Sequence, residues 1–558
     1  MRLTLNKLTI DEFFFRAVEK YADNPCAGFA GETPITYRQL AEKCLEVRKI
    51  LIGLGVKKGQ KVLLLGENSP NWVAAFLGIM THGAVVVPVL PDFPEADINH
   101  IIRHSEAVAA FLSASVYATL DLAPLEFLRA VYSLQDFSLL HERRKKPRKR
   151  KASGPAPGLL ADEPIGEEDL AEILYTSGTT GHSKGVMLTH KNLVTNAMAG
   201  ADTVKAVDEH SIVLTLLPLA HSYGSTCTLL GNLYCGASLY FLTRKPSPKV
   251  LIDAMQKVRP TVLTGVPLIF EKVYHKRVLP QISKNAILRW LLRLKPGRRY
   301  LYKKAGKRIM EMFGGRLECA VIGGAALNPE VEAFLREGNI PYTLGYGLSE
   351  CSPLVSAAPV RETKPGAVGR PIAGVQVRIS EADPETGVGE ILVKGPNVMR
   401  GYYKNPEANA KVFTADGWLV TGDRGFLDGD GYLFIRGRSK NVIVGPSGEN
   451  IYPEVIEELL KESPYVEEAL VYAEDGRIVG RIYPDYDYME EVHGESSEPK
   501  VQKEIAGILE EVRKEVNRKL PPFSQINRVI QQTEPFEKTP TNKIKRALYV
   551  PGYLSGRA

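Results

Sequence analysis

A loop rich in glycine, serine and threonine has the residue types that bind phosphate groups. It lies between two apolar, β-prone runs, Ile173–Tyr175 and Val186–Leu188, and its candidate ligand-binding residues are Thr176, Ser177, Gly178, Thr179, Thr180, Gly181 and Lys184. Glycines let the backbone approach a ligand, hydroxyls donate hydrogen bonds, and the lysine adds a positive charge. The Gly-Lys-Ser/Thr spacing of a Walker A loop is absent. The segment alone therefore predicts either a polyphosphate-binding loop or a flexible hairpin turn.

A glycine-rich turn at residues 343–350 combines an aromatic ring, a hydroxyl and a carboxylate, supplied by Tyr346, Ser349 and Glu350. Mg²⁺ binds through one or two protein carboxylates together with phosphate oxygens, so Glu350 is a candidate metal ligand. A packed tyrosine and a turn glutamate would explain the same residues without any ligand.

Two more segments end apolar runs with groups that suit a nucleoside. Gly324 and Ala325 follow the run Cys319–Ile322, and their small size would let a flat base lie against the backbone. Asp423 ends the segment Gly417–Asp423, where its carboxylate could accept hydrogen bonds from two ribose hydroxyls. Taken singly, a tight turn and a capping aspartate are equally good explanations.

Seven motifs follow one another along the chain: Y-T-S-G-T-T-G-H-S-K-G, L-P-L-A-H-S-Y-G, V-I-G-G-A-A-L, G-Y-G-L-S-E, G-W-L-V-T-G-D, G-R-S-K-N and K-T-P-T-N-K-I-K-R. In this order they resemble the adenylate-forming superfamily of acyl-CoA synthetases, luciferases and peptide-synthetase adenylation domains, from about Thr36 to Arg546. The resemblance implies a two-step reaction. A carboxylate attacks the α-phosphorus of ATP to give an acyl-adenylate and pyrophosphate, and a thiol, usually of coenzyme A, then displaces AMP.

The resemblance also implies which residues would bind the phosphates. The loop at 176–184 would hold the β- and γ-phosphates of ATP, with Lys184 as an electrostatic clamp. Ser349 would touch the α-phosphate, and Glu350 would ligate Mg²⁺.

The nucleoside would be bound by residues of three other motifs. Tyr346 would stack on adenine beside Gly324 and Ala325, while Asp423 and Arg438 would hold the ribose. These roles come from matching positions in the family.

Lys543 matches the family's catalytic lysine. The attack brings two negative groups together, and one ammonium bridging both would lower the electrostatic cost of the transition state. The family usually has glycine before this lysine, where this chain has Asn542. Asparagine tolerates the left-handed conformation better than most residues, so we expect the turn to survive. Ser349 replaces a more usual threonine and keeps the hydroxyl.

Three further residues take roles from their family positions. His221 would orient the substrate carboxylate in its neutral form, although a lone histidine is often structural. Lys440 lies where family members swing the small domain between the two half-reactions. Gly448 would pass a pantetheine arm, because a Cβ there would narrow the channel.

The expected elements alternate between helix and strand, which favours an α/β fold. Thr36–Gln39 has capping-box spacing before a helical repeat that stops at Gly55, and Lys61–Leu65 is typical of a strand. The uncharged stretch Trp72–Leu90 is broken at Thr81–Gly83, which favours a buried helix, a turn and a buried strand over a membrane span.

The pattern of apolar, polar and glycine residues changes after Arg436, which predicts a domain boundary there. We expect an AMP-binding domain of helices packed on β-sheets at 1–437, a hinge at 438–441, and a small mobile α+β lid domain at 442–558. The lid should contain helices at Ile451–Lys461 and Val501–Leu520 and short strands around 471–472 and 478–482.

The net charge of +7 is concentrated locally. Residues 143–151 carry eight positive charges and no acid, and the rest of the chain has a net charge of −1. This run suits either a solvated surface loop or contact with anionic lipid, and no interleaved aromatic residues support nucleic-acid binding. A second region at 286–310 mixes cationic and large apolar residues. It equally suits a helix on a membrane surface or an ordinary amphipathic helix.

The motifs G-P-S-G-E-N-I-Y-P-E and K-T-P-T-N-K-I-K-R look most like those of bacterial long-chain fatty acid–CoA ligases. The predicted partners are therefore a fatty acid, ATP with Mg²⁺, and coenzyme A. Acyl loading of a carrier-protein pantetheine is the alternative, and a non-enzymatic membrane adaptor is a third hypothesis. Six scattered cysteines and the lack of an uninterrupted apolar leader predict a cytoplasmic protein. The sequence leaves open membrane association and the oligomeric state, a homodimer included.

Overall fold

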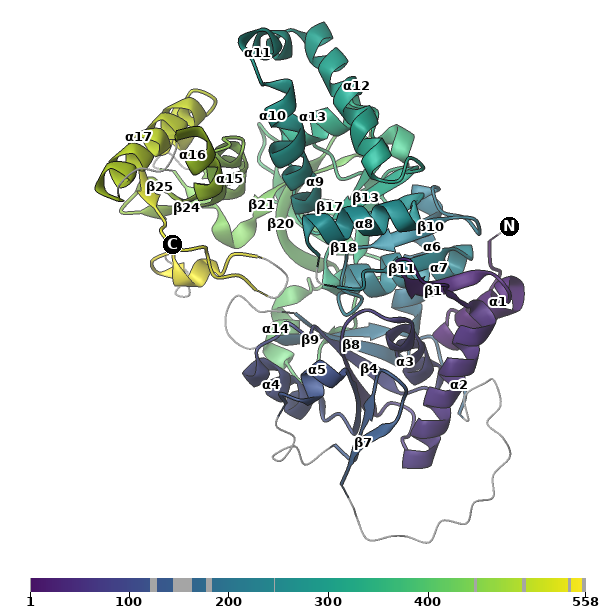
Figure 1. The fold of residues 1–558 in the computed structure, drawn as a ribbon. Coiled ribbons are helices and arrows are strands. Elements are labelled where there is room, and N and C mark those ends of the chain that lie inside the picture. The colour runs from purple at the N-terminus through teal and green to yellow at the C-terminus, as the bar shows by residue number, and fades with distance from the viewer. Residues whose placement is uncertain are drawn as a thin grey trace.

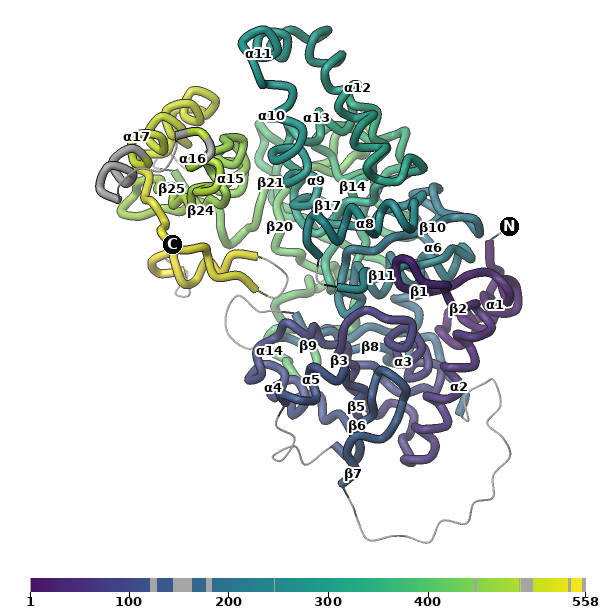
Figure 2. The backbone as a smooth tube through the Cα atoms, viewed as in Figure 1, coloured from purple at the N-terminus to yellow at the C-terminus, as the bar shows by residue number. Residues whose placement is uncertain are grey.

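The computed structural model describes residues 2–120, 128–143, 163–176, 183–244, 246–445, 449–493, 498–539 and 543–553 (Figure 1). Helices packed on β-sheets form a large N-terminal part, and a smaller group of helices and strands at the left of Figure 1 follows it. In the tube view of Figure 2, the chain leaves the large part after β21 and enters the small part at α15.

An eight-stranded sheet has the strand order β19-β9-β8-β4-β3-β5-β6-β7. Its strands are β3 (Lys61–Leu65), β4 (Val85–Val89), β5 (Ala109–Leu112), β6 (Ala130–Ser133), β7 (Leu139–Glu142), β8 (Leu170–Thr176), β9 (Lys184–Thr189) and β19 (Gly401–Tyr402). The strands from β8 to β6 in this order pair in parallel, and β9 pairs antiparallel with β8. The predicted loop with its two β-prone flanks is therefore framed by the β8–β9 hairpin.

The helix predicted after Thr36 is α2 (Tyr37–Leu54). The Thr36 Oγ1 accepts a hydrogen bond from the Gln39 backbone N–H at 3.2 Å, and the Gln39 side chain accepts one from the Thr36 N–H at 2.9 Å. These bonds satisfy two N–H groups that a helix start otherwise leaves unpaired. The helix ends at Gly55, whose φ of 66° is left-handed. Both predicted ends are confirmed.

The uncharged stretch at 72–90 folds as α3 (Pro70–Thr81), a turn at Gly83 and β4, and nearly all of it is buried in the core. The expectation of a buried helix and strand is confirmed. None of the helices in the described part of the chain combines the length and apolar composition that a bilayer-crossing segment needs.

A nine-stranded sheet has the order β16-β15-β14-β13-β12-β10-β11-β1-β2. Its strands are β1 (Pro25–Phe29), β2 (Ile35–Thr36), β10 (Ile212–Thr215), β11 (Ser238–Phe241), β12 (Val262–Gly265), β13 (Cys319–Gly323), β14 (Tyr342–Gly347), β15 (Leu354–Ala357) and β16 (Arg370–Pro371). Its central strands are parallel. The helix α6 (His190–Val204) packs against both large sheets, so one apolar core joins them.

Further helical segments cover these sheets. They are α1 (Ile10–Tyr21), α4 (Glu95–Ser105), α5 (Ala114–Tyr117), η1 (Tyr223–Leu230), α7 (Gly231–Cys235), α8 (Pro248–Val258), α9 (Pro267–Val273), η2 (Tyr274–Val278), α10 (Leu279–Ile282), α11 (Ala286–Arg293), α12 (Lys295–Met312), α13 (Pro329–Glu337) and α14 (Pro406–Val412). The cationic region expected as one helix is thus two, α11 and α12, which meet at Leu294 ahead of Pro296 and Gly297. Proline fits the first turn of the second helix, where its missing N–H costs nothing.

A four-stranded antiparallel sheet, ordered β17-β18-β20-β21, leads to the C-terminal part. Its strands are β17 (Gln376–Ser380), β18 (Gly389–Lys394), β20 (Leu419–Leu427) and β21 (Leu433–Arg438). The elements beyond it are β22 (Ile443–Val444), β23 (Asn450–Ile451), α15 (Pro453–Lys461), β24 (Val466–Glu474), β25 (Arg477–Pro484), α16 (Tyr486–His493), α17 (Glu498–Asn517) and β26 (Arg528–Gln531). They enclose an apolar core of their own. The predicted α/β fold with a smaller α+β C-terminal part is confirmed.

Candidate active site

Asp423 lies at a point where three elements meet. Register places it opposite Arg438 on the paired strands β20 and β21, and the Arg438 Nε lies 2.8 Å from the Asp423 Oδ1. The Tyr346 hydroxyl, at the end of β14, donates a 2.7 Å hydrogen bond to the Asp423 Oδ2. Burial and the neighbouring Asp423 carboxylate raise the pKa of Tyr346, so its hydroxyl keeps its proton. The structure therefore brings together three of the residues predicted to bind the nucleoside.

Glu350 and Lys184 are linked by a tyrosine that the sequence did not identify. Tyr402 lies on β19, which pairs with β9. Its hydroxyl donates a 2.8 Å hydrogen bond to the Glu350 Oε1, and the Lys184 Nζ lies 4.9 Å from the centre of its ring. Burial and the Glu350 charge raise the pKa of Tyr402. A cross-strand pairing creates this contact, and no sequence spacing signals it.

The two ends of the predicted phosphate loop are well defined. Thr176 lies opposite Lys184 in the β8–β9 ladder, and its hydroxyl contacts the Lys184 carbonyl at 3.4 Å. The loop positions between them, Ser177, Gly178, Thr179, Thr180 and Gly181, lie outside the described residues.

Lys543 is carried by a short hairpin near the C-terminus. Lys538 and Ile544 pair across it, and the Lys543 N–H donates to the Thr539 hydroxyl at 3.2 Å. Lys543 is exposed, and we refer to the region around Asp423, Glu350 and Lys543 as the cleft. Desolvation by the surrounding protein and the Arg438 charge lower its pKa, while Asp423 and Glu350 partly oppose this shift. The predicted lysine thus lies within electrostatic reach of both predicted carboxylates. Its neighbour Asn542 lies outside the described residues.

Positive charges from three segments of the chain act on one another here. Lys440 lies in a 3₁₀ turn (Ser439–Asn441) directly after β21. Burial, followed by the charges of Arg438, Arg546, Lys184 and Lys543, lowers the pKa of Lys440 to about 8. A cluster of cations that depresses its own members' pKa values is complementary to a polyanion, since bound negative charge would relieve the mutual repulsion.

His221, Ser349 and Gly324 are three further residues predicted for the site. The His221 Nδ1 accepts a hydrogen bond from the Tyr223 N–H at 3.3 Å, and the Ser222 and Ser349 hydroxyl oxygens are 3.3 Å apart. Burial, and then the Lys543 charge, lower the pKa of His221 to about 4, so its ring is neutral near pH 7 as expected. Gly324 adopts a φ of 90° directly after β13 and is exposed, as is Ala325.

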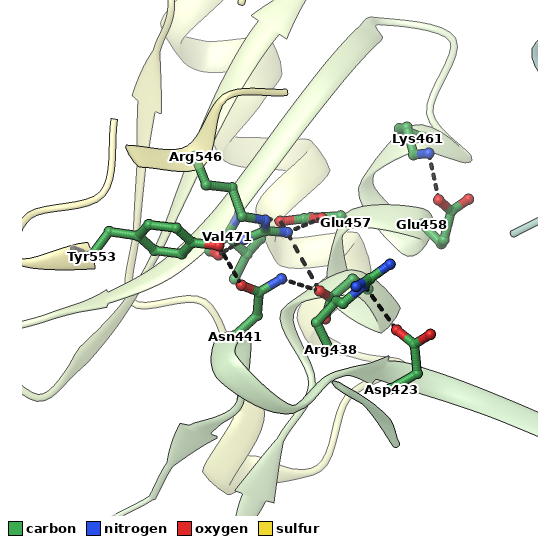
Figure 3. A network of polar contacts seen from close by, with 10 residues as sticks. Asp423, Arg438, Asn441, Glu457, Glu458, Lys461, Val471, Arg546 and Tyr553 are labelled. Carbon is green, nitrogen blue, oxygen red and sulfur yellow. Dashed lines mark hydrogen bonds and ion pairs between the residues drawn. The ribbon is translucent and has the colours of Figure 1, made fainter. Parts of the chain in front are cut away.

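A polar network ties the segment after Lys543 to the end of β21 (Figure 3). Arg546 donates two hydrogen bonds to the Glu457 carboxylate, at 2.5 and 2.6 Å, and one to the Val471 carbonyl at 3.1 Å. The Tyr553 hydroxyl donates to the Asn441 Oδ1 at 3.0 Å. Arg546 is the last residue of the motif K-T-P-T-N-K-I-K-R, but the sequence alone predicted no role for it. Its partners, 75 and 89 positions away, could not be read from spacing.

The cleft has one carboxylate suited to Mg²⁺. Glu350 binds Tyr402 through Oε1, and no described residue hydrogen-bonds its Oε2. No group of three or more histidine, cysteine, aspartate or glutamate side chains in the described ranges could hold a metal ion on its own. Mg²⁺ takes few protein ligands when phosphate oxygens complete its shell, so Glu350 fits a magnesium–nucleotide complex. Gly448, the predicted pantetheine-channel residue, lies outside the described residues.

Two carboxylates, a cluster of cations and a protonated tyrosine are groups suited to binding a nucleotide. Residues 14–403 match the AMP-binding enzyme family, and the chain belongs to that family. The long-chain-fatty-acid–CoA ligase FadD15 of Mycobacterium bovis is 30% identical over 481 residues, which cover 81% of this chain and 77% of that protein.

Two other proteins extend the comparison over nearly the whole chain. The chloroplastic long-chain-fatty-acid–acyl-carrier-protein ligase AEE15 of Arabidopsis thaliana is 27% identical over 98% of this chain and 85% of its own length. The crystal structure of the anthranilate CoA ligase AuaEII in complex with anthranoyl-AMP has a TM-score of 0.77 at 21% identity, with 96% of each chain covered. That likeness establishes the fold.

Proposed function

We propose that this protein is an AMP-forming acid–thiol ligase that activates a long-chain fatty acid with ATP and transfers the acyl group to coenzyme A. The observation that supports it most is the arrangement around Asp423, which lies 2.8 Å from the Arg438 Nε and accepts a 2.7 Å hydrogen bond from the Tyr346 hydroxyl. Membership of the AMP-binding family and the similarity to a long-chain-fatty-acid–CoA ligase support the same chemistry.

In the first step, the chain's residues hold ATP and the fatty acid for direct attack. Asp423 accepts from the ribose hydroxyls, assisted by Arg438, while Tyr346 stacks on adenine beside Gly324 and Ala325. The Tyr346 hydroxyl fixes the orientation of the Asp423 carboxylate through their 2.7 Å bond. The base and the ribose are therefore positioned by groups that already contact one another.

The phosphates occupy the cationic side of the cleft. Residues 176–184 hold the β- and γ-phosphates, and Lys184 balances charge on the departing pyrophosphate. Ser349 donates to the α-phosphate. Glu350 would hold Mg²⁺, which would supply positive charge to the phosphates. Tyr402 keeps the Glu350 carboxylate oriented through its hydroxyl.

Lys543 bridges the attacking carboxylate and the α-phosphate. The carboxylate is already a nucleophile and needs no base, so the lysine acts by stabilising negative charge in the transition state. His221 is neutral and orients the carboxylate without adding a proton.

The second step needs a different arrangement of the C-terminal part. We place the AMP-binding domain at 1–437, the hinge at 438–441 around Lys440, and the lid at 442–558. Lys543 leaves the cleft with the lid, and the turn containing Gly448 enters to line the pantetheine channel. In the first step, by contrast, Lys543 lies beside Asp423 and Glu350.

The chain length of the acid is tested by pyrophosphate release. A panel of acids from about C2 to C18 should give its highest kcat/KM among the long chains, because each buried CH₂ contributes ~0.8 kcal/mol. Highest activity with acetate or an aromatic acid would contradict the fatty acid assignment.

Loading of a carrier protein is the second candidate, favoured by the similarity to the acyl-carrier-protein ligase AEE15 along nearly the whole chain. Purified protein is given palmitate and ATP, then either coenzyme A or acyl carrier protein. Acyl-CoA as the product supports our proposal. Acylated carrier protein without acyl-CoA would assign the second candidate instead. Cytoplasmic location and the homodimer remain predictions from sequence.

A further inference from the structure

The helices α11 and α12 form a projection at the top of Figure 1. We call residues 284–308 the cap. Figure 2 shows the same chain path, in which α9 and α10 lead upward from the body to α11. No residue of α11 is buried. The cap is therefore more exposed than the other long helices around the sheets.

Large apolar side chains on the cap point into solvent. The exposed fractions are 70% for Ile287, 59% for Trp290, 40% for Leu294 and 64% for Tyr300. Ile287 and Trp290 are three positions apart on α11, so they share one face of that helix, and Leu294 follows directly after its last residue. Scattered exposed apolar residues are ordinary, but a contiguous group with an aromatic ring marks an interaction surface.

The exposure does not come from a loosely attached segment. Leu288, Leu291 and Leu292 pack on the apolar core beneath the cap. Arg298 makes a double hydrogen bond to Glu337 at 3.0 and 2.6 Å, which joins α12 to α13. A side-chain Cβ on Gly306 would lie only 2.1 Å from the Gly338 carbonyl oxygen, so the two backbones are in direct contact. The cap thus has one face fixed to the protein and a second apolar face in solvent.

The rim of this apolar face is strongly cationic. Between Lys272 and Met310 the sequence has no aspartate or glutamate, and the cap alone contains ten lysine and arginine residues. Within the described ranges, Arg298 is the cap residue whose charge is paired with a carboxylate. Arg289 and Arg293 lie on α11 beside Trp290 and are exposed.

We propose that the cap is a docking surface for anionic phospholipid membranes. Trp290, Ile287 and Leu294 would enter the boundary between headgroups and acyl chains, and the arginines and lysines would contact lipid phosphates. An indole ring with aliphatic neighbours favours a membrane over a nucleic acid, which would require bases stacked on aromatic rings along a backbone groove.

The cap also lies at the end of a short path from the cleft. Val266 precedes α9 and its side chain is 3.7 Å from the position of a Cβ on Gly324. From there α9, η2 and α10 continue to α11. Docking through the cap would hold the cleft near a membrane, from which a poorly soluble acid could be taken. The docking itself does not depend on the acid used.

Vesicle sedimentation with the full chain tests the proposal. Phosphatidylcholine vesicles with about a third phosphatidylglycerol should bind the protein, while pure phosphatidylcholine vesicles bind it much more weakly. Binding should fall steeply as salt rises above about 0.1 M, because headgroup and side-chain charges are exposed to screening. Trp290 should report the insertion by fluorescence, since Trp72 is fully buried and Trp418 is packed beneath Arg378.

Variants separate the two contributions. Arg289→Gln with Arg293→Gln should weaken binding about 30-fold, from about fivefold for each cation. Ile287→Ser with Trp290→Ser should weaken it at least about tenfold through lost apolar burial. The matched controls are Lys49→Gln with Lys57→Gln and, for the apolar pair, Phe523→Ser, all at exposed positions elsewhere. The controls should bind like the unaltered protein.

Some results would overturn the proposal. These are equal binding to both vesicle types, cap variants that bind normally while deletion of 143–151 abolishes binding, or tighter binding to duplex RNA than to vesicles. Circular dichroism and pyrophosphate release with a short, soluble acid show that each variant is folded. If the unaltered protein binds vesicles but shows no ligase activity, the proposed function is rejected, and the docking surface is still supported.

Discussion

The cleft and the cap both contain clusters of positive charge, but the charges differ in their burial and in their neighbours. In the cleft, Lys440 and Lys543 are crowded by other cations and partly desolvated, and their pKa values are lowered. Two carboxylates, Asp423 and Glu350, are fixed among them by tyrosines. On the cap, the cations other than Arg298 lie in solvent, with no acid nearby in the sequence.

This difference in the environment of the charges determines which ligands each surface can distinguish. Partly desolvated charges in fixed positions interact strongly and reward a ligand whose charges match them in place. Exposed charges on flexible stems are screened by salt and accept many arrangements of phosphate. We therefore expect the cleft to discriminate between ligands and the cap to respond mainly to the charge density of a surface.

The largest effect should follow removal of one positioned charge from the cleft. Lys543→Ala should lower fatty-acid-dependent pyrophosphate release ~10²–10³-fold, the usual effect of removing a group that stabilises transition-state charge. The matched control is Lys545→Ala, which removes an exposed lysine two positions away. Conversion of supplied acyl-adenylate and coenzyme A to acyl-CoA should continue at a normal rate. Unchanged pyrophosphate release would remove Lys543 from the mechanism.

A smaller effect should follow loss of the hydroxyl that orients Glu350. Tyr402→Phe keeps the ring beside Lys184 and removes a hydrogen bond to a charged carboxylate, which is worth about 1.5–3 kcal/mol. We expect the KM for magnesium-ATP to rise roughly 10- to 100-fold. Tyr403→Phe is the control, because the Tyr403 ring packs on His104 instead. Equal KM values for the two variants would show that Tyr402 is only a packing residue.

A rise in pH should weaken ATP binding in the cleft about tenfold and should leave vesicle binding by the cap nearly unchanged. Lys440 is charged below its pKa of about 8 and loses that charge above it. If ATP binds the charged form, the KM for ATP should rise about tenfold between pH 7 and 9. Lys440→Arg should flatten this profile, since guanidinium keeps its proton. Vesicle binding through the cap arginines should change little over the same range. An identical rise in the Lys440→Arg variant would assign the titration to another group.

Local sequence signals predicted local structure well. The capping box at Thr36, the glycine stop at Gly55 and the β-prone flanks of the 176–184 loop were all placed correctly, because each depends on near neighbours. The last long helix shows the limit. It was expected to run to Leu520, but α17 ends at Asn517, whose side chain hydrogen-bonds both the N–H and the carbonyl of Ile526.

The candidate site was found through motifs, and its supporting contacts were not. Asp423, Glu350 and Lys543 stood in recognisable patterns, whereas Tyr402 and the Glu457 partner of Arg546 did not. Both of these depend on which strands and helices lie side by side in three dimensions. A single sequence carries no signal for such pairings beyond the fold itself.

The hydrogen bonds on either side of Lys543 affect the conformational entropy that is lost when substrates bind. On one side the Glu537 N–H donates a 2.8 Å hydrogen bond to the Tyr549 hydroxyl oxygen, and on the other side Arg546 is bound to Glu457. The chain at Glu537 and at Arg546 is thus held in place when the protein folds, before any substrate arrives. Less conformational freedom is lost when ATP and the acid bind, and more of their binding energy can favour the reaction.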